Sequence, residues 1–185
     1  KKFPERFVNC GIAEGNMMSI AAGIAATGKL VFASTFAMFA AGRAFEQVRN
    51  SIGYTRLPVK IGATHAGLSV GEDGATHQCN EDIATMRVIP NMTVVVPADY
   101  VSTKALVKAA AEFDGPVYLR MGRLAAPNLY EEDAAFEIGK AAELFPGTDA
   151  AIIAAGLMVH EAVRAREILA AQGVSARVID MHTIK

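Results

Sequence analysis

Tryptophan is absent from the 185 residues, and only two residues are cysteines. Two cysteines cannot build the disulfide framework of a small secreted domain, and their scarcity is typical of a reducing compartment. The 18 Lys and Arg side chains are balanced by 19 Asp and Glu, so no excess of positive charge favours nucleic acid. The most apolar run, residues 30–41, is too short to span a bilayer. Without a signal-peptide pattern, we expect a cytoplasmic protein that binds neither nucleic acid nor membranes.

Helical and extended patterns alternate along the first two thirds of the chain. With 52% hydrophobic residues and a mean hydropathy of +0.26, the chain can bury a substantial core. We expect strands at residues 30–34, 58–64, 93–96 and 117–120, and helices at residues 14–27, 38–51, 81–87 and 99–113. The strand at 30–34 is expected to be buried. This alternation predicts an α/β fold, a parallel sheet with helices on both faces.

The pattern lapses between residues 122 and 148, where prolines and an acidic run are typical of a linker. A strand, a helix and a strand follow, at 150–154, 158–171 and 176–179. One such unit cannot close a core of its own, so it either joins the first sheet or begins a second α/β domain. We favour the second interpretation and expect domains at residues 1–138 and 139–185.

Two motifs that suggest phosphate or metal chemistry have simpler explanations. Gly23 to Lys29 nearly spells a phosphate-binding loop, but Leu30 stands where a metal-ligating hydroxyl is needed, and a helix precedes the glycines. A helix end is the better interpretation. His77, Cys79 and Glu81 could approach a zinc ion, but no further pair of ligands completes a four-coordinate site.

Gly67 to Gly71 matches the nucleophile elbow of serine hydrolases, with Ser69 as the nucleophile. Asp180 and His182 would then complete the triad. A true elbow runs from a strand into a helix, whereas Glu72-Asp73-Gly74 continues a loop, so an ordinary glycine-rich turn is favoured. A serine hydrolase and a non-catalytic binding module remain as alternatives to the function inferred below.

The loop from His65 to Gln78 carries two histidines, two acids and three glycines directly after an apolar strand. In an open parallel sheet, ligands bind at such strand ends. Glu14 begins an apolar helix, where it is either a first-turn acid on the helix dipole or a buried carboxylate that shares a proton with a ligand. Phe36 and Phe39 are either core residues or an aromatic wall for a flat ring.

These segments together resemble the pyrimidine-binding domain of transketolases, in particular the separate C-terminal section of split transketolases. The matching strings are Gly11-Ile-Ala-Glu14, Ser34-Thr-Phe36-Ala-Met-Phe39, Thr64-His65 and Gly71-Glu-Asp73-Gly-Ala-Thr-His77-Gln. The resemblance covers essentially the whole chain, and the last string is highly specific. Deoxyxylulose-phosphate synthases, a second thiamine-diphosphate family, share Glu14 and the Asp73 to His77 core. They usually lack matches to Phe39 and His65, so transketolase is favoured.

The resemblance implies thiamine diphosphate as the cofactor and transfer of a two-carbon ketol unit between sugar phosphates. Glu14 matches the carboxylate that hydrogen-bonds the cofactor's aminopyrimidine, and Phe36 and Phe39 match the aromatic pocket around that ring. His77 matches a residue that handles hydroxyl protons of the substrate. The donor's hydroxyl would bind the match to Asp73, while matches to His65 and Arg120 would hold the substrate phosphate, for which a planar guanidinium is suited.

The resemblance also implies partners. The family's Gly-Asp-Gly and Asn motif, which holds Mg²⁺ or Ca²⁺ and the diphosphate, is not found in this sequence and belongs to another domain. We therefore expect an N-terminal, diphosphate-binding partner chain, and association with further copies of the same fold. A leading strand and helix are expected before Lys1, and the C-terminal domain is expected to continue beyond Lys185. Gly42 stands where many transketolases have a third aromatic ring, and Gly15 departs from the usual residue after the glutamate.

Overall fold

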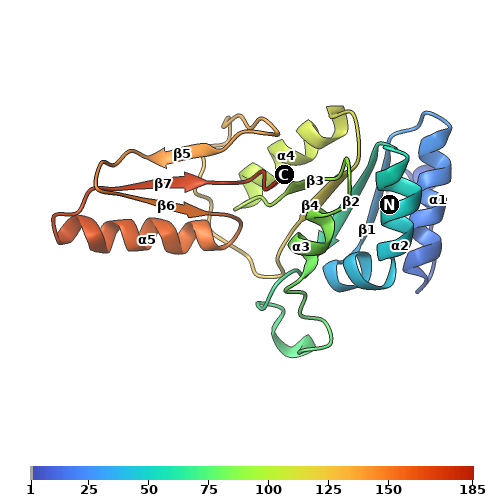
Figure 1. Cartoon of the computed structure of the whole chain (residues 1–185), viewed down its shortest axis with the longest axis horizontal. Helices are drawn as coiled ribbons and strands as arrows, with labels where there is room; N and C mark the ends of the chain where they lie inside the picture. Colours follow the sequence, from blue (N-terminus) through green and yellow to red (C-terminus); the bar gives the residue numbers. More distant parts are fainter. Residues whose placement is uncertain (1) are drawn as a thin grey trace.

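Two lobes, each built on its own β-sheet, lie side by side in the computed structural model, which describes residues 2–185 (Figure 1). The larger sheet has four parallel strands in the order β1-β2-β4-β3, namely β1 (Val31–Phe36), β2 (Val59–Thr64), β3 (Thr93–Val95) and β4 (Val117–Arg120). The helices of this lobe are α1 (Glu14–Ala26), α2 (Phe45–Gln47), α3 (Asp82–Arg87) and α4 (Tyr100–Glu112). Short 3-10 turns, η1 (Pro4–Arg6) and η4 (Gly71–Asp73), and π-helical segments, η2 (Phe39–Arg43) and η3 (Val48–Tyr54), complete it.

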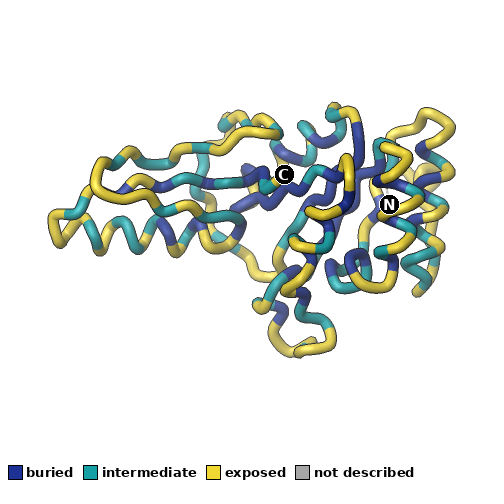
Figure 2. The backbone as a smooth tube through the Cα atoms, in the orientation of Figure 1, coloured by how far each residue is buried: buried dark blue, intermediate teal, exposed yellow. Residues whose placement is uncertain are grey.

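Helices cover both faces of the larger sheet, as expected. Because side chains alternate along a strand, Tyr118 of β4 points to one face and its neighbours point to the other. On the first face, α1, α3 and the segment from η2 to η3 pack in one buried core, with Met18, Ile61 and Met86 among its members (Figure 2). On the second face, α4 packs Leu106 against β4. The α/β prediction is confirmed.

The first strand is less buried than its sequence suggested. β1 lies at an outer position of the sheet, and Phe32 in its middle is 47% exposed. Its apolar residues predicted a buried strand. On the face to which Phe32 points, however, α4 packs over β3 and β4, at the other side of the sheet from β1. The expected helix at 38–51 is also irregular, since the amide of Ala44 bonds the carbonyl of Phe39 in a π-turn.

The smaller lobe contains β5 (Ala142–Phe145), β6 (Ala150–Ala154), α5 (Met158–Ala171) and β7 (Ala176–Asp180). Its sheet has the order β5-β7-β6, in which β6 is parallel and β5 antiparallel to β7. The expected parallel unit is therefore present as a separate sheet. β5, however, lies inside the segment interpreted as a linker. The sequence does not indicate this strand, because its four residues, between Gly139 and Pro146, are too few to show a clear alternation of apolar and polar side chains.

The alternative motif interpretations can be compared with local backbone geometry. Gly28 has φ of +83° and its amide bonds the carbonyl of Ala25, so it ends α1 as a helix cap and not as a phosphate loop. Ser69 lies five residues beyond the end of β2 and is followed by a single 3-10 turn, so no nucleophile elbow is formed. Within residues 2–185, no helix combines the length and the apolar character that crossing a bilayer requires.

A buried carboxyl group joins the smaller sheet to the connecting segment. Asp180, at the end of β7, is fully buried, and its Oδ2 accepts a hydrogen bond of 2.7 Å from the Tyr130 hydroxyl. Burial raises the pKa of Asp180 to about 6. The folded state therefore holds this proton more tightly than the unfolded chain does between about pH 4 and pH 6.

We expect Asp180→Asn to change how stability depends on pH. Because a raised carboxyl pKa adds stability only at low pH, the Asp180 contribution is lost as pH rises through about 6. The variant should gain stability relative to the parent as pH rises from 4 to 7, by about 1–3 kcal/mol in total. Urea unfolding at several pH values would measure this gain. If the difference in unfolding free energy between the variant and the parent stayed constant from pH 4 to pH 7, this would contradict a raised pKa of Asp180 in the folded protein.

Candidate functional site

The predicted site residues lie at the carboxyl ends of neighbouring strands. Phe36 is the last residue of β1 and is in register with Thr64, the last residue of β2. Arg120 ends β4 and is in register with Ala63. Parallel pairing thus brings three segments that are far apart in sequence to one edge of the sheet, where ligands bind in folds of this class.

Four rings form a cluster at this edge, which we call the ring cluster: Phe36, Phe39, His65 and His77. Phe36 stacks on His65 with centroids 3.8 Å apart and on Phe39 with centroids 5.8 Å apart. His77 meets Phe39 edge-on at 5.3 Å. All four side chains are half-buried. The cluster therefore offers flat apolar faces beside two imidazoles, a surface suited to an aromatic ligand.

The two histidines are held by their backbone and by neighbouring hydroxyl groups. His65 has φ of +58°, an uncommon conformation for a residue with a side chain, and it follows directly on β2. Such strain is found preferentially at functional sites. Nδ1 of His65 lies 3.0 Å from the Thr64 hydroxyl, and Nδ1 of His77 lies 2.9 Å from that of Thr76. Within residues 2–185, the opposite nitrogen of each ring, Nε2, makes no hydrogen bond.

Glu14 is connected to the ring cluster through an arginine. The carboxylate belongs to the first residue of α1, and its side chain is only 11% exposed. Nη1 of Arg43 lies 3.5 Å from Oε2 of Glu14, and Cζ of Arg43 lies 4.2 Å from the centre of the Phe39 ring. A half-buried carboxylate and the aromatic faces thus flank one guanidinium.

The structure places Asp73 beside a second arginine. Oδ2 of Asp73, in η4, lies 3.6 Å from Nη1 of Arg123, which also bonds Oε1 of Glu72 through Nη2. That hydrogen bond lowers the pKa of Glu72 to about 2. Arg123 also donates to the carbonyl of Val70, so it ties the loop between β2 and α3 to the segment after β4.

Arg120 is held in position by a buried acid, Asp82. Nε of Arg120 donates to Oδ2 of Asp82 at 2.8 Å, and the Tyr118 hydroxyl donates to the same oxygen at 3.1 Å. Asp82 and Tyr118 are fully buried, and burial together with Asp82 raises the pKa of Tyr118 well above its usual value. The guanidinium head lies near Gly67, whose added Cβ would be 3.2 Å from Nη2.

The candidate zinc ligands His77, Cys79 and Glu81 do not form a metal site. Within the described residues, no group of three or more His, Cys, Asp and Glu side chains could hold an ion. Cys79 is buried, and burial raises its pKa to about 11, which disfavours the thiolate that would bind zinc. Asp180 and His182, the other members of the rejected triad, are both buried: Asp180 ends β7, and the carbonyl of His182 accepts from the amide of Val96, which follows β3.

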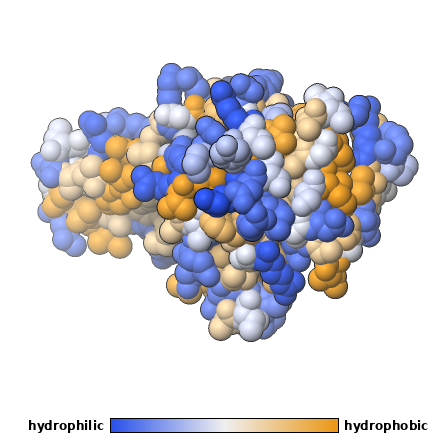
Figure 3. Space-filling view, turned by 45° about the vertical axis from the view of Figure 1, so that its right-hand side comes forward, coloured by the Kyte–Doolittle hydropathy of each residue, from blue (hydrophilic) through white to orange (hydrophobic). Residues whose placement is uncertain are grey.

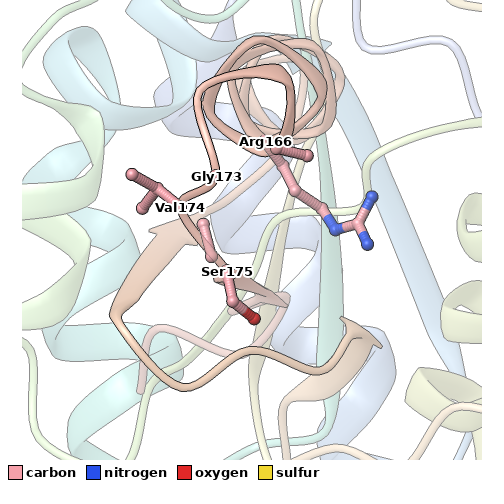
Figure 4. Close-up of a pocket in the computed structure, with 6 residues that line it drawn as sticks. Arg166, Gly173, Val174 and Ser175 are labelled. Atoms are coloured by element: carbon pink, nitrogen blue, oxygen red, sulfur yellow. The ribbon is translucent and has the colours of Figure 1, made fainter.

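Other surface features lie away from this edge. A pocket in the smaller lobe is lined by α5 and the turn before β7, and its Arg166 extends away from Val174 and Ser175 (Figure 4). Arg166 stacks on Phe145, with Cζ 4.4 Å from the ring centre. Apolar side chains also reach the surface of both lobes (Figure 3), among them Ile12 and Ile168.

Sequence reasoning overlooked three residues that contact the predicted ones: Arg43, Asp82 and Arg123. Arg43 follows Phe39 by four residues, a spacing that places two helical side chains on one face. Arg123 follows Arg120 at the same strand end, so both were visible in the sequence. Nothing in the sequence marks Asp82 as the partner of Arg120, because 38 residues separate them.

Comparison with known proteins gives two family matches. The transketolase pyrimidine-binding domain matches residues 1–128, and the transketolase C-terminal domain matches residues 139–185. A protein named as a transketolase C-terminal section from Methanocaldococcus jannaschii is 57% identical over the whole chain, which covers 59% of that protein. One of the subunits of an apulose-4-phosphate transketolase from Phocaeicola vulgatus is 44% identical, and the chain covers 60% of it. The chain thus spans about three fifths of these relatives.

A solved structure agrees with these matches. A split-gene transketolase, described as an inactive β4 tetramer, superimposes with a TM-score of 0.91 at 55% identity. The superposition covers 98% of this chain and 58% of the other. The α/β architecture with a four-stranded parallel sheet and a second, smaller sheet is shared. From its sequence matches and its fold, the chain belongs to the transketolase family.

Proposed function

We propose that the chain is part of a transketolase C-terminal subunit that transfers a two-carbon ketol unit between sugar phosphates, with thiamine diphosphate as cofactor. The observation that carries this proposal is the placement of Glu14 beside the ring cluster, at the strand-end edge where the family's ligands are expected. The subunit names of the relatives support the proposal.

The residues present fit the pyrimidine ring of that cofactor. A flat aromatic ring with a basic nitrogen needs an aromatic face and a protected carboxylate, and Phe39 and the 11%-exposed Glu14 offer both. The bound cofactor supplies a carbon nucleophile that attacks ketones, which side chains alone cannot provide. In our proposal, Glu14 shares a proton with the pyrimidine nitrogen, and Phe36 and Phe39 bind and orient the ring.

The remaining residues receive substrate roles in this proposal. His77 would accept and return hydroxyl protons of the sugar through Nε2, since its Nδ1 is held by Thr76. Asp73 would bind the donor's hydroxyl. His65 and Arg120 would hold the phosphate, and Arg120 would use its terminal N–H groups because Nε is held by Asp82.

The proposal requires a second polypeptide. Within residues 2–185 no cluster of ligands could hold the Mg²⁺ or Ca²⁺ ion that accompanies the cofactor's diphosphate. We infer that an N-terminal partner chain supplies that half of the site and that the assembly also contains further copies of this fold. The tetrameric relative, described as inactive, is consistent with this need. We further propose that residues 1–138 form the pyrimidine-binding domain and residues 139–185 belong to the C-terminal domain.

Reconstitution tests the proposed function. The full-length subunit, mixed with its diphosphate-binding partner, thiamine diphosphate and Mg²⁺, should transfer a ketol unit from a ketose phosphate to an aldose phosphate. Ser69→Ala should leave this activity unchanged, whereas a serine hydrolase would lose its activity and would react with a fluorophosphonate. Absence of ketol transfer in a verified complex would refute the proposal.

His77→Ala should lower turnover by about 100-fold, because it removes a positioned acid–base group. His160→Ala is the matched control, since His160 lies on α5 of the smaller lobe, where it contacts the carbonyl of Ala98. Steady-state kinetics of the reconstituted complex would measure both. If His77→Ala retained full turnover, the role of a non-catalytic binding module would be favoured over catalysis by this chain.

A further inference from the structure

Arg43 occupies the place where the proposed pyrimidine contacts should form. Its guanidinium lies over Phe39, with Cζ 4.2 Å from the ring centre, and reaches Oε2 of Glu14 at 3.5 Å. Phe39 and Glu14 are the aromatic ring and the carboxylate that the proposed function assigns to the cofactor ring. The guanidinium and the ring cannot contact the same face and the same oxygen together.

The local backbone explains how Arg43 reaches this position. The amide of Ala44 bonds the carbonyl of Phe39, five residues back, so the helix widens into a π-turn between them. Such turns are rare and are found frequently at functional sites. Residues four apart already share a helix face, and Arg43 projects back over Phe39. The neighbouring Gly42 has no side chain, and a Cβ there would lie 2.6 Å from Cε of Met38.

We propose that Arg43 is an internal competitor for the pyrimidine site, which covers Phe39 and Glu14 when the site is empty and withdraws when the cofactor ring binds. The inference rests on the proposed function and adds a residue that sets cofactor affinity. A chain whose competent state is only partly populated binds its ligand more weakly by that fraction. Arg43 therefore lowers the affinity for cofactor and frees Glu14 only in the loaded site.

The contacts of Arg43 are weak enough to be displaced. Its side chain is 56% exposed, so water screens the ion pair with Glu14 and solvates the guanidinium once it withdraws. A partly exposed cation over an aromatic ring likewise contributes little. Together these contacts change a binding constant by about threefold to tenfold, which is enough to tune affinity without preventing binding.

The test uses Arg43→Met in the full-length subunit, assembled with its diphosphate-binding partner. Methionine keeps an unbranched apolar stem and removes the charge. We expect the dissociation constant of thiamine diphosphate with Mg²⁺, measured by isothermal titration calorimetry, to fall by about threefold to tenfold. Arg49→Met is the matched control, because Arg49 is exposed on η3 and bonds only its neighbour Asn50 among the contacts seen.

A second ligand identifies where the effect arises. Inorganic pyrophosphate with Mg²⁺ has no pyrimidine ring, so its dissociation constant should be the same in Arg43→Met and in the parent. Unchanged or weaker cofactor binding in Arg43→Met, or equal tightening of both ligands, would overturn the role of Arg43. Failure of the parent complex to bind thiamine diphosphate at all would instead refute the proposed function.

Discussion

Glu14→Gln should lower turnover of the reconstituted enzyme by about 10²–10⁴-fold, the range for removal of a positioned acid–base group. Glutamine keeps the size of the side chain and a carbonyl oxygen, but it cannot share a proton with a pyrimidine nitrogen. The side chain is only 11% exposed, so water has little access to replace the lost carboxylate. We expect the dissociation constant of thiamine diphosphate to change much less, by under tenfold, because the aromatic faces remain.

Glu112→Gln is the control for this experiment. Glu112 is exposed at the end of α4, which packs on the opposite face of the sheet from α1. Steady-state turnover and calorimetric cofactor binding would be measured for the parent and both variants. Equal turnover in Glu14→Gln and Glu112→Gln would exclude Glu14 from the proton transfer. A large loss of cofactor binding with unchanged turnover at saturation would make Glu14 a binding residue only.

The parts of the fold that sequence predicted well are those with long periodic signals. α1 and α4 each run for 13 residues, and Gly28 and Asp99 mark their ends as expected. Asp99 caps α4 through the Ser102 amide at 2.8 Å. β5 was overlooked because its four residues carry no such period, and its pairing with β7 is set by tertiary contact.

The members of the ring cluster were named from the sequence, but the contacts around them were not. Residues of the ring cluster were all named from the sequence, because strand ends and loop glycines locate them. The π-turn between Phe39 and Ala44 has no sequence signature, although the four-residue spacing of Phe39 and Arg43 does place both side chains on one helix face. The pairing of Asp82 with Arg120 depends on how α3 packs beneath β4, which no local pattern encodes.

Asp82→Ala is expected to lower the free energy of unfolding by about 3–5 kcal/mol, the cost of breaking a buried ion pair by removing one partner. Asp82 is fully buried and accepts from both Arg120 and the Tyr118 hydroxyl. Removing Asp82 leaves Nε of Arg120 without its carboxylate partner and the buried hydroxyl of Tyr118 without its acceptor. Asp82→Asn should cost less, because the amide oxygen can still accept from Nε of Arg120.

The exposed pair of Asp114 and Arg56 supplies the matched control for Asp82→Ala. Its atoms are 3.2 Å apart, but its side chains are 85% and 61% exposed, so Asp114→Ala should cost under about 1 kcal/mol. Urea unfolding of the parent and the variants at pH 7 would measure the differences. Similar losses in Asp82→Ala and Asp114→Ala would show that the buried pair contributes little. A large loss only in Asp82→Ala would show that the position of Arg120, and hence of the proposed phosphate contact, is set by the core beneath it.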